Sequence, residues 1–152
     1  MTRNRWITVF LFCIYLALLL YLMFFSDMEQ RGLMVKEHYT YNFVPFREIS
    51  RNFLAGKRLG LGYVILNLYG NIAGFMPLGF MLPVFSRRCR RSILATTMCG
   101  YLLSYGIEMS QLAFRAGSCD VDDLILNTLG AFCGYLVFQL VQWIRRDLRK
   151  HG

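Results

Sequence analysis

Residues 124–144 read LILNTLGAFCGYLVFQLVQWI, twenty-one consecutive positions without Asp, Glu, Lys, Arg or His. A helix needs roughly 20 apolar residues to cross about 30 Å of hydrocarbon. This stretch is therefore long and apolar enough to span a bilayer as a single helix.

Three further stretches also lack Asp, Glu, Lys, Arg and His, at residues 7–25, 61–85 and 92–107. The last of these is short, and we extend it to residue 114 because neighbouring helices can shelter its polar turns. The chain is 56% hydrophobic and only 17% charged, more apolar than a small soluble domain could bury. The sequence therefore predicts one all-α membrane domain over residues 1–152, an integral membrane bundle with transmembrane helices at about 7–25, 61–85, 92–114 and 124–144.

The first stretch follows Arg3 and Arg5, as the core of a cleaved signal peptide would. It is longer than a usual signal core, and residues 24–27 offer no small-x-small cleavage site. We therefore expect a retained anchor. Ten Lys and Arg residues lie in the N-terminal tail, the second loop and the C-terminal tail, against seven on the other side. This excess predicts that both termini are cytoplasmic.

The formal net charge of +8 does not indicate nucleic-acid binding, because the basic residues lie at the ends of the apolar stretches rather than on one face. Membrane lipids are the partners that this distribution favours. The first loop, residues 26–60, is too short for a core of its own. Within it, Phe46, Ile49 and Phe53 recur at helical spacing. This spacing favours a helix lying in the membrane interface, and an irregular loop with aromatic anchors is an equal alternative.

Small residues recur four positions apart in two of the stretches, as Gly70 with Gly74 and Gly130 with Gly134. Such pairs let helix backbones approach closely in a membrane. We favour packing within one chain over packing between chains, although the spacing alone leaves the oligomeric state open.

Polar side chains gather near the outer ends of three predicted spans. They are Asn67 and Asn71 in the second, Glu108, Gln111 and Arg115 in the third, and Asp120, Asp122, Asp123 and Asn127 at the start of the fourth. Polar groups inside a membrane cost free energy and usually face a bundle interior or a cavity, which favours a binding site in the outer leaflet. The structural alternative is that the asparagines hydrogen-bond between helices and the Asp run caps the fourth helix.

This group of polar residues contains acids but no identifiable nucleophile. Burial of Glu108 would favour its protonated form unless Arg115 compensates, so Glu108 could give and take protons. Asp120 and Asp123 could hold a hard divalent cation through their oxygen atoms. No Ser or Cys accompanies a base at catalytic spacing, so neither an enzymatic activity nor a cofactor is defined by these residues.

Several motifs together resemble the VanZ-like family of bacterial membrane proteins. They are Asn42-Phe43-Val44-Pro45-Phe46, Asn67-Leu68-Tyr69-Gly70-Asn71 with Phe75-Met76-Pro77-Leu78-Gly79-Phe80, Glu108-Met109-Ser110-Gln111, and the run from Asp120 to Ala131. The resemblance implies a small multi-pass protein of the cytoplasmic membrane, in a family whose namesake is linked to reduced susceptibility to the glycopeptide antibiotic teicoplanin. Family members often carry an Arg about three residues before the first Asp. Gly117 stands there in this chain, and Arg115 is the nearest substitute.

The sequence leads to one preferred function and two alternatives. The preferred function is binding of a polar, anionic or sugar-bearing lipid-linked molecule of the cell envelope. We name as ligand-binding candidates Asn71, Glu108, Gln111, Asp120, Asp123 and Asn127, with Asn42, Asn67 and Arg115 in support. The first alternative is an enzyme acting on such a lipid through Glu108, Asp120 and Asp123. The second is a small carrier or channel component, which the apolar inner halves of the spans disfavour.

Overall fold

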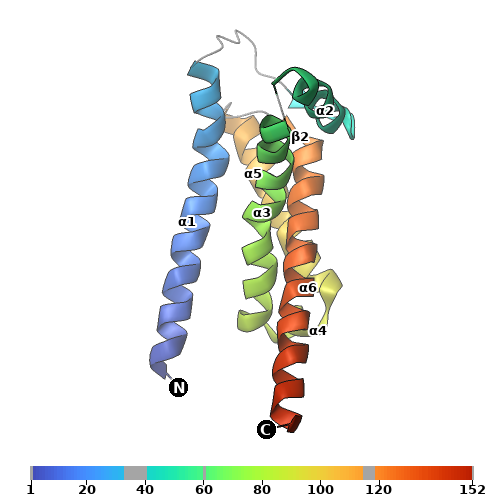
Figure 1. Ribbon diagram of the computed structural model, residues 1–152. Helices are drawn as coiled ribbons and strands as arrows, with labels where there is room; N and C mark the ends of the chain where they lie inside the picture. The colour runs from blue at the N-terminus through green and yellow to red at the C-terminus, as the bar shows by residue number, and fades with distance from the viewer. Residues whose placement is uncertain (1, 33–40, 60, 115–118, 152) are drawn as a thin grey trace. The chain divides into compact units, whose positions relative to one another are not determined.

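The computed structural model describes residues 2–32, 41–59, 61–114 and 119–151, and these residues are almost entirely helical (Figure 1). The elements follow in the order α1 (Thr2–Gly32), β1 (Tyr41–Asn42), α2 (Arg47–Leu59), α3 (Leu61–Phe85), α4 (Arg87–Arg91), α5 (Ile93–Phe114), β2 (Cys119–Asp120) and α6 (Val121–His151). The predicted all-α class is confirmed. The two-residue strands β1 and β2, which pair with each other, were not predicted.

Three of the described helices are long and apolar enough to cross a membrane. The qualifying segments are Trp6–Phe24 of α1, Leu68–Phe85 of α3 and Val121–Lys150 of α6. The fourth predicted span corresponds to α5, which is a continuous helix of 22 residues. Its Thr, Ser and Gly residues, together with Glu108 and Gln111, lower its mean hydropathy. The structure therefore supports three apolar spans and leaves the fourth crossing as a proposal.

The chain divides into two compact units. The first comprises Met1–Tyr41 and Ile107–Cys119, and the second comprises Asn42–Gly106 and Asp120–Gly152. Within the second unit, α3 and α6 lie side by side (Figure 1). They run parallel, because Asn71 near the middle of α3 contacts Asp123 at the start of α6, and Phe80 contacts Phe138 further along both helices.

Glycines set the close approach of α3 and α6. A Cβ atom added to Gly130 would overlap the Ile72 carbonyl, and one added to Gly134 would overlap the Met76 carbonyl. This pair therefore packs within the chain, as the sequence predicted. Gly70 behaves differently, because a Cβ atom there would meet open space. The preferred interpretation, packing within one chain, is therefore wrong for Gly70.

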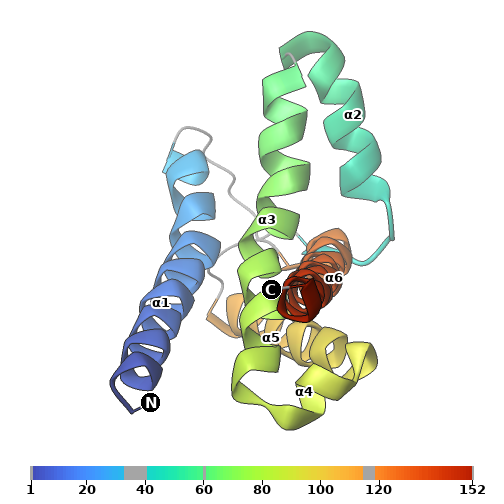
Figure 2. The same cartoon turned by 60° about the horizontal axis from the view of Figure 1, so that its bottom comes forward.

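The part of α5 in the second unit lies against α6 in the opposite direction, and Figure 2 shows α6 beside both α3 and α5. Gly100 of α5 abuts Ala131, and four residues later Ser104 meets Asn127. Near the start of α6, Ile49 of α2 packs against a small apolar cluster formed by Leu68 and Leu126. The second unit is thus a group of packed helices with α2 attached at the end where α6 begins.

Candidate functional site

Asp122, in the first turn of α6, holds the start of α2. Its side chain is buried, with only 1% of its surface exposed. Its carboxylate accepts hydrogen bonds from the backbone N–H groups of Phe46 at 2.5 Å, Glu48 at 2.8 Å and Ile49 at 3.1 Å. Phe46 has a left-handed φ of 66°, which is uncommon for a residue other than glycine. Asp122 therefore satisfies the free amides of another helix, and the expectation that it caps its own helix is wrong.

Asp120 does cap α6. It precedes the first helical residue, and its Oδ1 accepts a hydrogen bond from the backbone N–H of Asp122 at 2.8 Å. The Nδ2 atom of Asn42 also donates to the two oxygens of Asp120, at 3.2 and 3.4 Å. Oδ1 of Asn42 in turn accepts from the backbone N–H of Val44 at 3.2 Å. This pair thus joins the start of α6 to the segment that leads into α2.

Burial raises the pKa of Asp120 to about 6. The neighbouring carboxylates of Glu48 and Asp122 act in the same direction, because a second negative charge nearby disfavours ionisation. The hydrogen bonds from the Asp122 backbone and from Asn42 oppose the shift without cancelling it. Asp120 is therefore an acid that exchanges its proton close to neutral pH.

The polar side chains at the start of α6, here called the polar line of α6, are Asp120, Asp122, Asp123 and Asn127. Nδ2 of Asn71 in α3 donates to Oδ1 of Asp123. One turn later, Nδ2 of Asn127 donates to the hydroxyl of Ser104 in α5 at 2.9 Å. Asn127 is 1% exposed, and its Oδ1 atom has no hydrogen-bond partner among the described residues. Asn71 and Asn127 therefore hydrogen-bond between helices, as the structural alternative proposed. The Oδ1 atom of Asn127 is still without a donor among the described residues.

The remaining candidates divide between the first unit and the residues that are not described. Glu108 and Gln111 belong to the first unit, and each is 5% exposed. Nε2 of Gln111 donates to the backbone carbonyl of Met23 in α1 at 2.8 Å. Arg115 and the side chain of Asn67 lie outside the described residues. The structure therefore brings together Asn42 with Asp120 and Asn71 with Asp123, while Glu108 and Gln111 are placed in the other unit.

Asp120 and Asp123 accept hydrogen bonds from side chains in different parts of the second unit. Among the residues that the structure describes, no group of three or more His, Cys, Asp or Glu side chains is arranged to hold a metal ion. Asp120 accepts from Asn42, and Asp123 accepts from Asn71 in a different helix. This geometry gives no support to a divalent cation shared between Asp120 and Asp123.

The residues that the sequence reasoning missed are Ser104 and the backbone of the α2 start. Ser104 precedes Glu108 by four positions in α5, and this spacing was the one available sign that it shares a helix face with a candidate residue. The backbone amides of Phe46, Glu48 and Ile49 carry no side-chain signal at all. Their role could be found only from the tertiary structure.

Long apolar helices whose polar side chains are paired in the interior define this chain as a helical membrane protein. The chain belongs to the VanZ/LLP1 family, whose model matches residues 12–142. The matched region contains every motif on which the predicted resemblance rests, so that prediction is confirmed. No curated protein and no solved structure matched the chain.

Proposed function

We propose that this protein binds the polar headgroup of a lipid-linked cell-envelope molecule, in the outer leaflet of the bacterial cytoplasmic membrane. The binding site in this proposal lies in the second unit, where α2 meets the start of α6. Both termini are cytoplasmic in this proposal, and α5 is the fourth crossing. At 22 residues, α5 is about 33 Å long, which is enough for a hydrocarbon core of about 30 Å. Its antiparallel contact with α6 suits a helix that returns through the bilayer.

Helix α2 is suited to the membrane interface. Phe53 and Leu54 are 62% and 64% exposed, and Arg51 is also exposed beside them. A helix with exposed aromatic, aliphatic and cationic side chains fits the headgroup layer, where apolar groups reach toward the acyl chains and cations meet phosphates. Because Asp122 fastens this helix to α6, an amphiphile at α2 would have its headgroup close to the polar line of α6.

The observation that carries the proposal is the buried Oδ1 of Asn127, which has no hydrogen-bond partner in the part of the chain that the structure describes. A buried acceptor left without a donor costs about 1–3 kcal/mol. A hydroxyl or ammonium group of a ligand would supply that donor. Asp123, one turn before Asn127, and Asp120 with its raised pKa are also acceptors when ionised. A set dominated by acceptors favours a headgroup rich in hydrogen-bond donors, such as a sugar or an amine, over a bare phosphate.

The test compares two variants that act on opposite ends of one hydrogen bond. Asn127→Leu has nearly the same size and removes the amide oxygen. Ser104→Ala removes the group that Asn127 donates to, but leaves that oxygen in place. Native mass spectrometry of protein purified with envelope lipids would measure which sugar-bearing or amine-bearing lipids are retained. We expect Ser104→Ala to keep them and Asn127→Leu to lose them by about tenfold.

Folding is checked by circular dichroism and size-exclusion chromatography on each variant. A folded Asn127→Leu protein that retains the same lipids would remove Asn127 from the mechanism and overturn the proposal. In cells, teicoplanin susceptibility of strains that express the two variants provides a second readout, and we expect any effect of the protein on susceptibility to follow lipid binding.

One observation favours the enzymatic alternative. An acid with a pKa of about 6, such as Asp120, can act as a proton donor or acceptor near neutral pH. In that alternative the protein would transfer or hydrolyse a group on the bound lipid, with Asp123 as a further acid in the second unit. Turnover of envelope lipids by the purified protein would support it, and turnover that persists unchanged in Asp120→Asn would contradict the role of this acid.

A further inference from the structure

Helix α6 continues well past its apolar stretch. Its last turns, residues 145–150, read RRDLRK and remain helical. They contain four cations and one carboxylate, and they follow Trp143, which is 65% exposed. The family model ends at residue 142, so membership of the family does not account for this segment.

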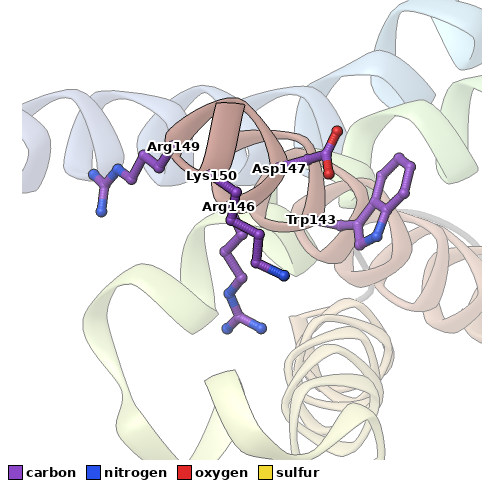
Figure 3. A pocket seen from close by; sticks show the side chains of 5 residues that line it. All are labelled: Trp143, Arg146, Asp147, Arg149 and Lys150. Carbon is purple, nitrogen blue, oxygen red and sulfur yellow. The ribbon is translucent and has the colours of Figure 1, made fainter. Parts of the chain in front are cut away.

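Four of these side chains share one face of α6. Trp143, Arg146, Asp147 and Lys150 are spaced by three, four and seven positions, which places them on adjacent turns of the same side. Together with Arg149 they line a shallow hollow (Figure 3). In Figure 3, Arg146 and Lys150 extend toward the same side of the helix, whereas Arg149 extends away from them. The face thus combines an indole ring with two cations that extend toward the same side of the helix.

A second set of cations lies in α4, at the same end of the second unit. Arg90 is used within the fold, because its guanidinium donates to the carbonyls of Pro83 at 2.9 Å and Val84 at 3.1 Å at the end of α3. The hydroxyl of Tyr135 in α6 donates to the Arg90 carbonyl at 3.4 Å. This contact fixes the level of α4 along α6.

From Tyr135 to Arg146 the helix advances eleven residues, or about 16 Å at 1.5 Å per residue. The arginines of α4 and the cations at the end of α6 therefore form two tiers, that is, two sets of cations at different levels along the α6 axis. The headgroup layer on each side of a bilayer is roughly 5–8 Å thick. Long Arg and Lys side chains of the two tiers can both reach such a layer by extending toward it.

We propose that Trp143, Arg146 and Lys150 bind the phosphate of an anionic phospholipid, in the leaflet that the α4 end of the second unit faces. A phosphate carries the negative charge that these two cations attract. An indole ring favours the boundary between headgroups and acyl chains. Zwitterionic lipids also hold a phosphate, but their net charge is zero, so the electrostatic gain is smaller. This site lies at the opposite end of α6 from Asp123 and Asn127 and does not depend on the function proposed for them.

Tryptophan fluorescence tests the proposal directly. The chain has two tryptophans, so Trp6→Phe leaves Trp143 as the only reporter. The full-length Trp6→Phe protein would be reconstituted in bilayers that contain either brominated phosphatidylglycerol or brominated phosphatidylcholine, since bromine quenches a tryptophan that it contacts. Each cation near an anionic membrane surface contributes about a fivefold preference. We therefore expect phosphatidylglycerol to quench Trp143 with at least a fivefold higher relative affinity than phosphatidylcholine.

Two double variants in the Trp6→Phe background separate a defined site from general attraction to positive charge. Arg146→Gln with Lys150→Gln removes both cations of the Trp143 face, and the preference should fall to the level that the remaining cations give. Arg145→Gln with Arg87→Gln removes the same charge from positions off that face, and most of the preference should remain. Asp147→Asn removes the carboxylate from the face and should raise the preference. Equal quenching by the two lipids, or equal losses in the two double variants, would overturn the proposal.

Discussion

Replacing Asp122 with alanine should release the start of α2 from α6. The wild-type carboxylate is buried and accepts three backbone N–H groups, from Phe46, Glu48 and Ile49. Alanine leaves these three donors without an acceptor and removes the negative charge from the positive end of the α2 dipole. The packing of Ile49 against Leu68 and Leu126 remains near this point, as do the hydrogen bonds from Asn42 to Asp120 just before α2.

The expected size of the effect follows from the number and kind of these bonds. A hydrogen bond to a charged group contributes about 1.5–3 kcal/mol, so three bonds could supply about 5–9 kcal/mol. Once α2 is released, water can reach its first turn and hydrogen-bond to these amides. This recovers part of the free energy lost with the three bonds. We therefore expect a net cost of about 3 kcal/mol, which corresponds to about a 100-fold increase in the open population of α2.

Hydrogen–deuterium exchange of α2 measures that population. In Asp122→Ala, the amides of Glu48 and Ile49 should exchange about 100-fold faster than in the wild type. The matched control is Asp123→Ala, which removes a neighbouring carboxylate of α6 and its bond from Asn71, but none of the bonds to α2. Wild-type protection of α2 in a folded Asp122→Ala protein would refute the proposed attachment.

Three further changes test the packing, the titration and the pairing of the second unit. Gly134→Leu should separate α3 from α6 and lower thermal stability by several degrees, whereas Gly70→Leu, which meets open space, should change it little. The folded protein holds the proton of Asp120 more tightly than the unfolded chain, since its pKa is raised from 3.8 to about 6. This contribution to stability is fully present below about pH 4 and is lost as the pH rises through 6, and thermal unfolding of Asp120→Asn should show a flatter dependence across that window. Exchanging the pair, as Asn71→Asp with Asp123→Asn, should recover in unfolding assays part of the stability that each single change removes.

The sequence was most informative where one physical constraint acts on a long stretch. Apolar runs without charge predicted the helices, because a bilayer requires about 20 such residues in a row. The glycines at 130 and 134 predicted close packing, since only a missing Cβ atom allows it. The same spacing at Gly70 had no such role, because a glycine motif does not indicate which face of its helix meets a partner. Helix α5 was harder to interpret, since its polar turns reduce the hydropathy that identifies a span.

The site was less predictable because neighbouring acids have different partners. Asp120, Asp122 and Asp123 are nearly adjacent, and nothing in the sequence distinguishes the one that faces α2. Asp120 lies just before α6, and the directions of Asp122 and Asp123 around the helix differ by about 100°. Consequently Asp120 caps its own helix, Asp122 holds α2, and Asp123 accepts from Asn71 in α3. Such a division depends on where the other helices lie, which only the folded structure specifies.

This division of partners also determines how variants of the three acids should be interpreted. A loss of function in Asp122→Ala would follow from the release of α2, even if Asp122 never meets a ligand. Asp123 differs, because it lies one turn from Oδ1 of Asn127 and accepts a hydrogen bond from Asn71 in α3, rather than the three that Asp122 accepts from the start of α2. Evidence for binding must therefore come from variants such as Asn127→Leu, in which an acceptor is removed while the attachment of α2 remains protected from exchange.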